Sequence, residues 1–105
     1  HSPLMREAAD AFAKVLEELP LLPPTMPFVS SISGTGESES GRIRVLLTEQ
    51  IVAPVQWTRA MLAIGEAESM ECGPGHVLAG LAKRTPGAPS VKPAGTPAAI
   101  AALLA

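Results

Sequence analysis

The chain reads S-M-E-C-G-P-G-H-V-L-A-G-L-A-K-R from Ser69 to Arg84. A short extended run enters a Gly-Pro-Gly corner and leaves it as an amphipathic helix. Gly73 and Gly75 permit backbone angles that other residues resist, and Pro74 fixes one angle between them. In α/β proteins such a strand-corner-helix often presents backbone groups to a ligand, but it also serves as a simple sharp connection. The stretch therefore predicts an α/β fold and leaves both roles of the corner open.

The residues on either side of the corner carry further predictions. Three apolar side chains share one face of the helix: Val77, Leu78 and Leu81. Lys83 and Arg84 place positive charge at the negative end of that helix. Cys72, at the end of the preceding strand, is most simply a small buried hydrophobe.

The N-terminal segment predicts the clearest helix of the chain. Ser2 is a good N-cap, and Pro3 suits the first helical position. Apolar residues then recur at helical spacing, at Leu4, Met5, Ala8, Ala9, Phe12, Val15, Leu16 and Leu19. Prolines between Pro20 and Pro27 remove backbone donors, so the helix must end there and an extended connector follows.

The centre of the chain predicts a strand, a loop and a helix. Phe28, Val29 and Ile32 indicate a strand of about five residues. Residues 33–41 read S-G-T-G-E-S-E-S-G, a polar surface loop whose glycines match neither a phosphate-binding loop nor a dinucleotide-binding motif. A helix follows, with an apolar stripe at Ile43, Leu46, Leu47 and Ile51. Gln50 falls on that stripe, and a glutamine on a buried side has to be hydrogen-bonded.

The remaining elements complete the predicted fold class. Pro54 ends the central helix and Trp57 opens another, whose inward face is Ala60, Met61 and Ile64. Beyond the corner, residues 90–92 are a possible strand, and Thr96-Pro97 begins an alanine-rich helix. This alternation predicts an α/β fold with short parallel strands covered by helices. Two or three strands make an incomplete sheet, so we expect further strands upstream.

Composition and charge argue against several classes of function. The 105 residues, with 47% hydrophobic and 17% charged residues, are typical of one globular domain. A net charge of -2 and 3% aromatic residues argue against a nucleic-acid partner. No apolar run approaches the ~20 residues that span a bilayer, and no basic-then-apolar leader opens the chain. The single cysteine cannot form an internal disulfide. We therefore expect a cytoplasmic protein without a membrane or nucleic-acid partner.

Few residues offer catalytic chemistry from their spacing alone. No serine lies in G-x-S-x-G, the strand-to-helix elbow that exposes a nucleophile. Cys72 and His76 flank the corner and need not face each other, so a catalytic Cys-His pair is not expected. Together with His1 and Glu71 they also lack any recognised zinc spacing. His1 stands immediately before a helix N-terminus, where a catalytic base is common, although a lone histidine is more often inert.

Three ordered motifs carry a resemblance to a known family. They are His1-Ser2-Pro3-Leu4-Met5, then Gln50 followed by Pro54-Val55-Gln56-Trp57, then E-C-G-P-G-H-V-L-A-G-L from Glu71 to Leu81. Over its whole length the chain resembles the C-terminal part of the malonyl-CoA:acyl carrier protein transacylases. The family usually has an aliphatic residue where Cys72 stands.

The resemblance implies a two-step acyl transfer. A serine takes malonyl from coenzyme A and passes it to the phosphopantetheine thiol of acyl carrier protein. Malonyl-CoA and acyl carrier protein are thus the implied partners, and no cofactor is expected, since the coenzyme A thioester is a substrate. His1 matches the family's catalytic histidine, and Gln50 matches the residue whose backbone carbonyl holds that imidazole. A carbonyl can fix the tautomer as an aspartate would, with less stabilisation of the imidazolium.

The resemblance also implies that residues 1–105 are an incomplete acyltransferase domain, the closing portion of its hydrolase-like large subdomain. In the family the serine elbow, the malonate-binding arginine, the oxyanion-hole glutamine and a ferredoxin-like subdomain all precede the histidine. We expect them in a missing N-terminal part of the same enzyme. None of the arginines Arg6, Arg42, Arg44 and Arg59 is expected to replace the malonate-binding arginine. Without the serine, the isolated chain is expected to be inactive.

Two alternative readings stay open at the level of the sequence. An acyltransferase domain of a polyketide or fatty acid synthase would share the chemistry and differ by long flanking domains. A non-catalytic helical interaction module would be a compact monomer, whereas a severed subdomain should expose apolar surface and associate.

Overall fold

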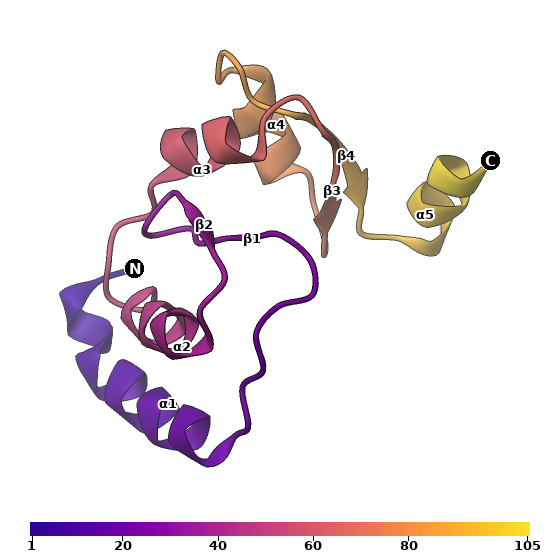
Figure 1. The fold of residues 1–105 in the computed structure, drawn as a ribbon. Helices are drawn as coiled ribbons and strands as arrows, with labels where there is room; N and C mark the ends of the chain where they lie inside the picture. Colours follow the sequence, from indigo (N-terminus) through magenta and orange to yellow (C-terminus); the bar gives the residue numbers. More distant parts are fainter. The chain divides into compact units, whose positions relative to one another are not determined.

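The computed structural model describes residues 1–105, the whole of the chain. They form two compact units, which we call unit 1 (His1–Ala63) and unit 2 (Ile64–Ala105). Unit 1 contains helices and a short antiparallel strand pair, whereas unit 2 contains a parallel strand pair with a helix after each strand (Figure 1). The predicted α/β class, with short parallel strands and helical cover, is confirmed. No helix is long and apolar enough to cross a lipid bilayer.

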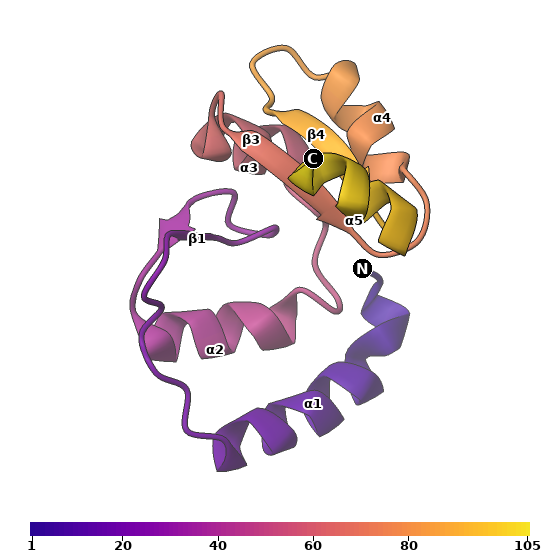
Figure 2. The ribbon, with the colours of Figure 1, turned by 90° about the vertical axis from the view of Figure 1, so that its right-hand side faces the viewer.

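Unit 1 opens with a helix in two parts. η1 (Pro3–Met5) is a single 3-10 turn, and α1 (Arg6–Glu18) continues from it. The predicted N-cap is confirmed, because the Leu4 N–H donates to the Ser2 hydroxyl at 3.3 Å. Figures 1 and 2 both show α1 beside α2 (Ser40–Glu49). The buried side chains of the two helices are Ala9, Leu16, Ile43 and Leu46.

The strand predicted at 28–32 is present, but its predicted length of about five residues is wrong. β1 (Phe28–Val29) has only two residues and pairs antiparallel with β2 (Gly36–Glu37). The chain turns after β1 because the buried Ser30 hydroxyl accepts the N–H groups of Ile32 and Ser33, both at 3.3 Å. The surface loop predicted over 33–41 is also wrong in part, since it contains β2 and the start of α2.

The central helix ends earlier than its apolar stripe predicted. α2 stops at Glu49, and Gln50 is its C-cap, so Gln50 does not sit inside the helix on a buried face as predicted. The next helix, α3 (Trp57–Ile64), begins at the predicted residue. Ala60 and Met61 are buried as expected, but Ile64 is 38% exposed.

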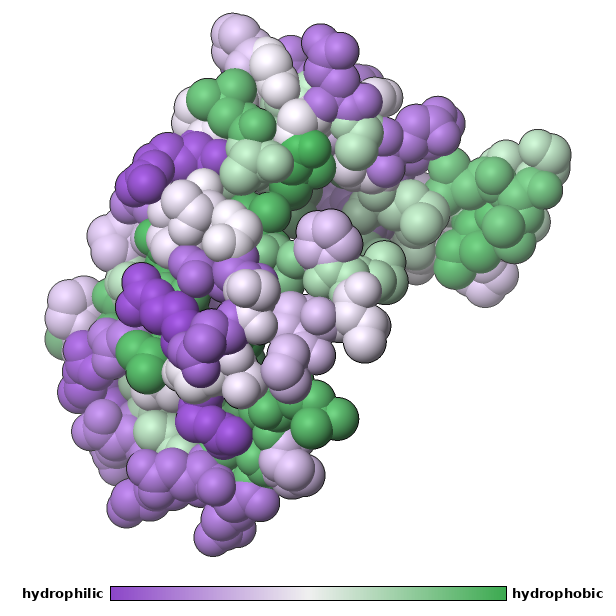
Figure 3. Space-filling model, viewed as in Figure 1, coloured by the Kyte–Doolittle hydropathy of each residue, from purple (hydrophilic) through white to green (hydrophobic).

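Unit 2 is built on two parallel strands. β3 (Glu68–Cys72) pairs with β4 (Ser90–Ala94), which lengthens the strand predicted at 90–92. α4 (Val77–Lys83) connects them and contacts β4. α5 (Pro97–Leu104) starts where predicted, because the Ala99 N–H donates to the Thr96 hydroxyl at 3.1 Å. Figure 3 shows that the surface of α5 is largely hydrophobic.

Two predictions about burial around the corner are wrong. Cys72 is exposed instead of buried, because strand alternation turns Glu71 toward α4 and its neighbours Met70 and Cys72 the other way. Val77 and Leu78, expected on the apolar face of the helix, are 71% and 43% exposed. The buried residues of α4, which contacts β4, are Ala79 and Ala82.

Candidate functional site

The first candidate site joins His1 to the end of α2. The Nδ1 atom of His1 lies 2.7 Å from the backbone carbonyl oxygen of Gln50. A carbonyl oxygen can only accept a hydrogen bond, so Nδ1 must carry the proton and donate it. The neutral imidazole then has its lone pair on Nε2, and the imidazole is exposed. The structure thus brings together the two residues that the sequence singled out.

The end of α2 is a natural place for an acceptor. The last carbonyl groups of an α-helix have no partner within the helix. Gln50 still donates its own N–H to the Leu46 carbonyl at 2.9 Å, so its carbonyl lies just past the last helical turn. Its side chain takes no part in the contact with His1, which is why any residue type at this position supplies the same acceptor.

Two further contacts hold the N-terminal segment against the end of α2. The N–H of Ser2 donates to the carbonyl of Ile51 at 3.3 Å. The Arg6 guanidinium pairs with the Glu49 carboxylate at 3.2 Å, with both side chains about half exposed. Ser2 and Arg6 follow His1, and their partners Ile51 and Glu49 lie on either side of Gln50, so the contacts position the imidazole relative to the helix end.

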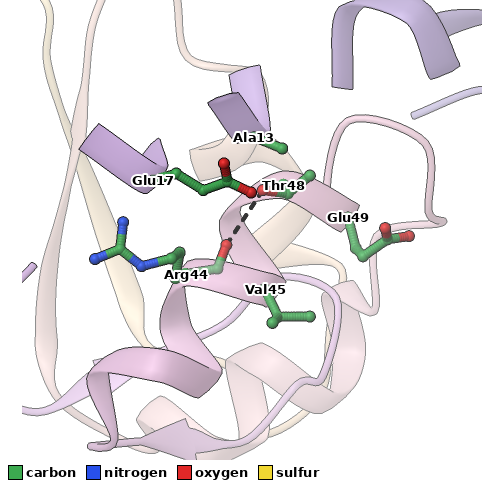
Figure 4. A pocket seen from close by; sticks show the side chains of 6 residues that line it. All are labelled: Ala13, Glu17, Arg44, Val45, Thr48 and Glu49. Carbon is green, nitrogen blue, oxygen red and sulfur yellow. Dashed lines mark hydrogen bonds between the residues drawn. The ribbon is translucent and has the colours of Figure 1, made fainter. Parts of the chain in front are cut away.

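A hollow of about 240 Å³ lies between α1 and α2 in unit 1 (Figure 4). It is lined by Ala13, Glu17, Arg44, Val45, Thr48 and Glu49. Arg44 Nη2 donates to the Leu19 carbonyl at 3.0 Å and so caps the C-terminus of α1. Within α2 the Thr48 hydroxyl donates to the Arg44 carbonyl at 3.3 Å, the contact drawn in Figure 4. These bonds serve the helix pair, whereas the other terminal nitrogen of Arg44, Nη1, is buried without a hydrogen-bond partner.

The second candidate site lies at the Gly-Pro-Gly corner of unit 2, and sequence reasoning missed its central residue. Glu71 is 8% exposed, and its two carboxylate oxygens accept the N–H groups of Leu78 at 3.0 Å and Ala79 at 2.9 Å. The bonds from Ala79 and Leu78 hold the pKa of the Glu71 carboxyl below its ordinary value, against the opposing effect of burial, and His76 acts in the same direction. The signal available in the sequence was a carboxylate at an inward strand position just before the corner.

Cys72 and His76 do not form a site with each other. Cys72 is an exposed thiol, and no hydrogen bond joins it to His76. No three or more histidine, cysteine, aspartate or glutamate side chains are grouped so that they could hold a metal ion.

Comparisons with known proteins agree with the motifs. No family model matches the chain. The malonyl CoA-acyl carrier protein transacylase of Salmonella typhimurium is 36% identical over 107 residues, and that of Escherichia coli K12 is 37% identical over the same length. Each match covers 99% of this chain and 35% of the relative, so the chain spans about a third of the length of these curated relatives.

Solved structures give the same result. A transacylase from Xanthomonas oryzae superposes with a TM-score of 0.84 at 38% identity, covering 99% of this chain and 34% of that one. A malonyl-transacylase solved with a type II polyketide acyl carrier protein gives a TM-score of 0.79 at 35% identity, covering 99% of this chain and 35% of that one. The resemblance seen in the sequence motifs is confirmed: over 99% of its length, the chain is similar in sequence and in fold to about a third of the malonyl-CoA:acyl carrier protein transacylases.

Proposed function

We propose that this chain supplies the general base for malonyl transfer from coenzyme A to acyl carrier protein, as part of a longer acyltransferase of fatty acid biosynthesis. The observation that carries the proposal is the 2.7 Å contact between His1 Nδ1 and the Gln50 carbonyl oxygen. It fixes the tautomer whose Nε2 can take a proton, and the exposed imidazole leaves that atom accessible. The similarity to transacylases over 99% of the chain supports the substrate class.

In the first half of the reaction, His1 Nε2 accepts the proton of a serine hydroxyl that lies outside this chain. The serine oxygen attacks the malonyl thioester carbonyl, and the carbon–sulfur bond breaks. The departing coenzyme A thiolate takes the proton back from Nε2. While the imidazole is protonated, the Gln50 carbonyl keeps its hydrogen bond to Nδ1 and so holds the ring in place.

The second half repeats the same proton path with another thiol. Nε2 accepts the proton of the phosphopantetheine thiol of acyl carrier protein, whose sulfur attacks the malonyl-serine ester. The serine leaves and recovers its proton from Nε2. One imidazole therefore serves as base and then acid in both halves, and a neutral carbonyl partner suits this because it stabilises the imidazolium less than a carboxylate would.

Partners and location follow from this reaction. The proposal names malonyl-CoA and acyl carrier protein as substrates and the N-terminal part of the same enzyme as the source of the serine. It requires no cofactor, because the coenzyme A thioester is a substrate. A cytoplasmic location is consistent with the free thiol of Cys72.

A chimeric enzyme tests the proposal. Residues 1–105 replace the matching C-terminal part of the E. coli transacylase, and malonyl transfer to acyl carrier protein is measured. The chimera should be active, and His1→Ala should lower kcat/KM by about 10³-fold, because a positioned base contributes roughly this much. Gln50→Ala should lower it far less, since the main-chain carbonyl remains.

His76→Ala is the matched control, since it removes the second histidine of the chain and should cost less than about tenfold in rate. A folded chimera without transfer activity would contradict the proposed function. So would a His1→Ala chimera that keeps a tenth or more of the activity.

A further inference from the structure

The Glu71 carboxylate bonds across the corner to the first turn of α4. Its two oxygens accept from Leu78 and Ala79, seven and eight residues further along the chain. The first N–H groups of a helix have no partner within the helix, so these two bonds satisfy donors that would otherwise be unpaired. The buried carboxylate is thereby shared between a strand and the helix that follows it.

The Gly-Pro-Gly corner lies in the chain between Glu71 and the two residues that bond to it. Gly73 and Gly75 have φ angles of +110° and +89°, a region that other residues rarely adopt. On the other side, a side chain on Gly95 would collide with the carbonyl of Gly73, so the backbone after β4 lies directly against the corner. The corner is therefore confined by Glu71 through its flanking elements and by the backbone at Gly95.

The backbone N–H groups of Ala79 and Leu78 lower the pKa of Glu71 more than any nearby charge does. His76, at the N-cap of α4, also lowers the pKa of Glu71, by electrostatic attraction. Lys92 on β4 pairs with Glu68 on β3 at 3.2 Å. By strand alternation, both side chains lie on the opposite face of the strand pair from Glu71. Lys83 lies at the opposite end of α4. No cation forms an ion pair with the Glu71 carboxylate.

We propose that Glu71 is a conformational latch of unit 2: its ionised carboxylate holds residues 73–76 in one conformation, and its protonation releases them. Protonation removes the negative charge and turns one of the two acceptor oxygens into a hydroxyl, so the bonds from the two N–H groups become weaker. This role concerns the conformation of unit 2, and it stands or falls independently of acyl transfer.

The direction of the pH dependence follows from the pKa of Glu71. Because the folded state lowers that pKa, the latch stabilises unit 2 fully above the pKa of an unfolded glutamate, about 4.3. The stabilisation is lost as the pH falls through the lower, folded value. The latch is therefore closed at neutral pH and opens only in acid.

NMR of the 105-residue chain tests the latch. Between pH 7 and pH 2, the amide protons of Leu78 and Ala79 should titrate with a midpoint below the ordinary pKa of a glutamate, about 4.3. At neutral pH, Glu71→Gln should lower the hydrogen-exchange protection of these two amides at least about tenfold, because bonds to a charged group are the strong ones. It should also abolish their acid titration.

Glu68→Gln is the matched control on the same strand and should change neither property. Unchanged protection in Glu71→Gln, or the same acid titration in that variant, would overturn the latch. If Glu71→Gln does not fold, the native chain still tests the latch. The proposal is overturned if the amides of Leu78 and Ala79 do not titrate, or if their midpoint lies at or above about 4.3, the ordinary pKa of a glutamate.

Discussion

The contact at His1 and the contact at Glu71 are opposite solutions to the same problem, the unpaired backbone groups at the end of a helix. At the end of α2 a ring nitrogen donates to a spare carbonyl, and at the start of α4 a carboxylate accepts from spare N–H groups. The first contact is exposed and uses one of the two ring nitrogens, whereas the second is buried and uses both oxygens. A contact that leaves one atom free suits proton transfer, and a contact that uses every atom suits structure.

The two contacts also differ in what they require from the sequence. The Gln50 carbonyl belongs to the main chain, so its position depends on where α2 ends. The Glu71 carboxylate belongs to a side chain that must have the right length and charge. The first contact should therefore be sensitive to the packing of α2, and the second to substitution of Glu71 itself.

Leu46→Ala should disturb the first contact from a distance. Leu46 is 5% exposed, one turn before Gln50, and its carbonyl accepts the Gln50 N–H. Deleting a buried leucine side chain typically costs 2 to 5 kcal/mol, about 3 kcal/mol as a central value. Urea unfolding of the 105-residue chain measures the loss. Val45→Ala, at a neighbouring residue that is 52% exposed, is the control, and an equal loss in both variants would contradict the packing argument.

Glu39→Ala allows Glu71 to be compared with a second carboxylate, which caps the start of α2. The Glu39 side chain accepts the N–H groups of Gly41 at 3.0 Å and Arg42 at 2.8 Å, but it is exposed and caps its own helix. Removing such an N-cap should cost about 1 kcal/mol in the same urea experiment. If Glu39→Ala lost more unfolding free energy than Glu71→Ala, the bonds of Glu71 across the corner would stabilise the chain no more than an ordinary N-cap does.

Arg6→Ala should have the smallest effect. The Arg6–Glu49 pair is 3.2 Å long, and its side chains are 53% and 43% exposed, so water screens most of the attraction. We expect a change of at most about 0.5 kcal/mol in unfolding free energy. In the chimera, kcat/KM should fall no more than a few-fold, because Ser2 still bonds to Ile51. A loss as large as that of His1→Ala would mean that this ion pair is needed to position the imidazole.

Local sequence signals predicted much of the fold. Ser2 and the Thr96-Pro97 pair marked helix starts, and the corner with its glycines was recognised because few residue types adopt such angles. The link between His1 and Gln50 came from a family resemblance, since no spacing rule connects residues 49 positions apart.

The errors came from contacts that a local pattern does not contain. The strand at 28–32 was cut short by hydrogen bonds to the Ser30 hydroxyl. α4 contacts β4 with Ala79 and Ala82 buried, while Val77 and Leu78 remain exposed. Periodicity identifies the apolar face of a helix, but it does not say which face packs against a neighbouring strand.

The absence of a Cβ atom at Gly95 allows the backbone after β4 to pack against the Gly-Pro-Gly corner. Because position 95 has no side chain, two stretches of main chain touch where the carbonyl of Gly73 meets the residue after β4. A methyl group there would act as a wedge and would lift the corner away from the strand ends. The close approach of these two backbone segments therefore depends on glycine at position 95, which is 22 positions after Gly73 in the sequence.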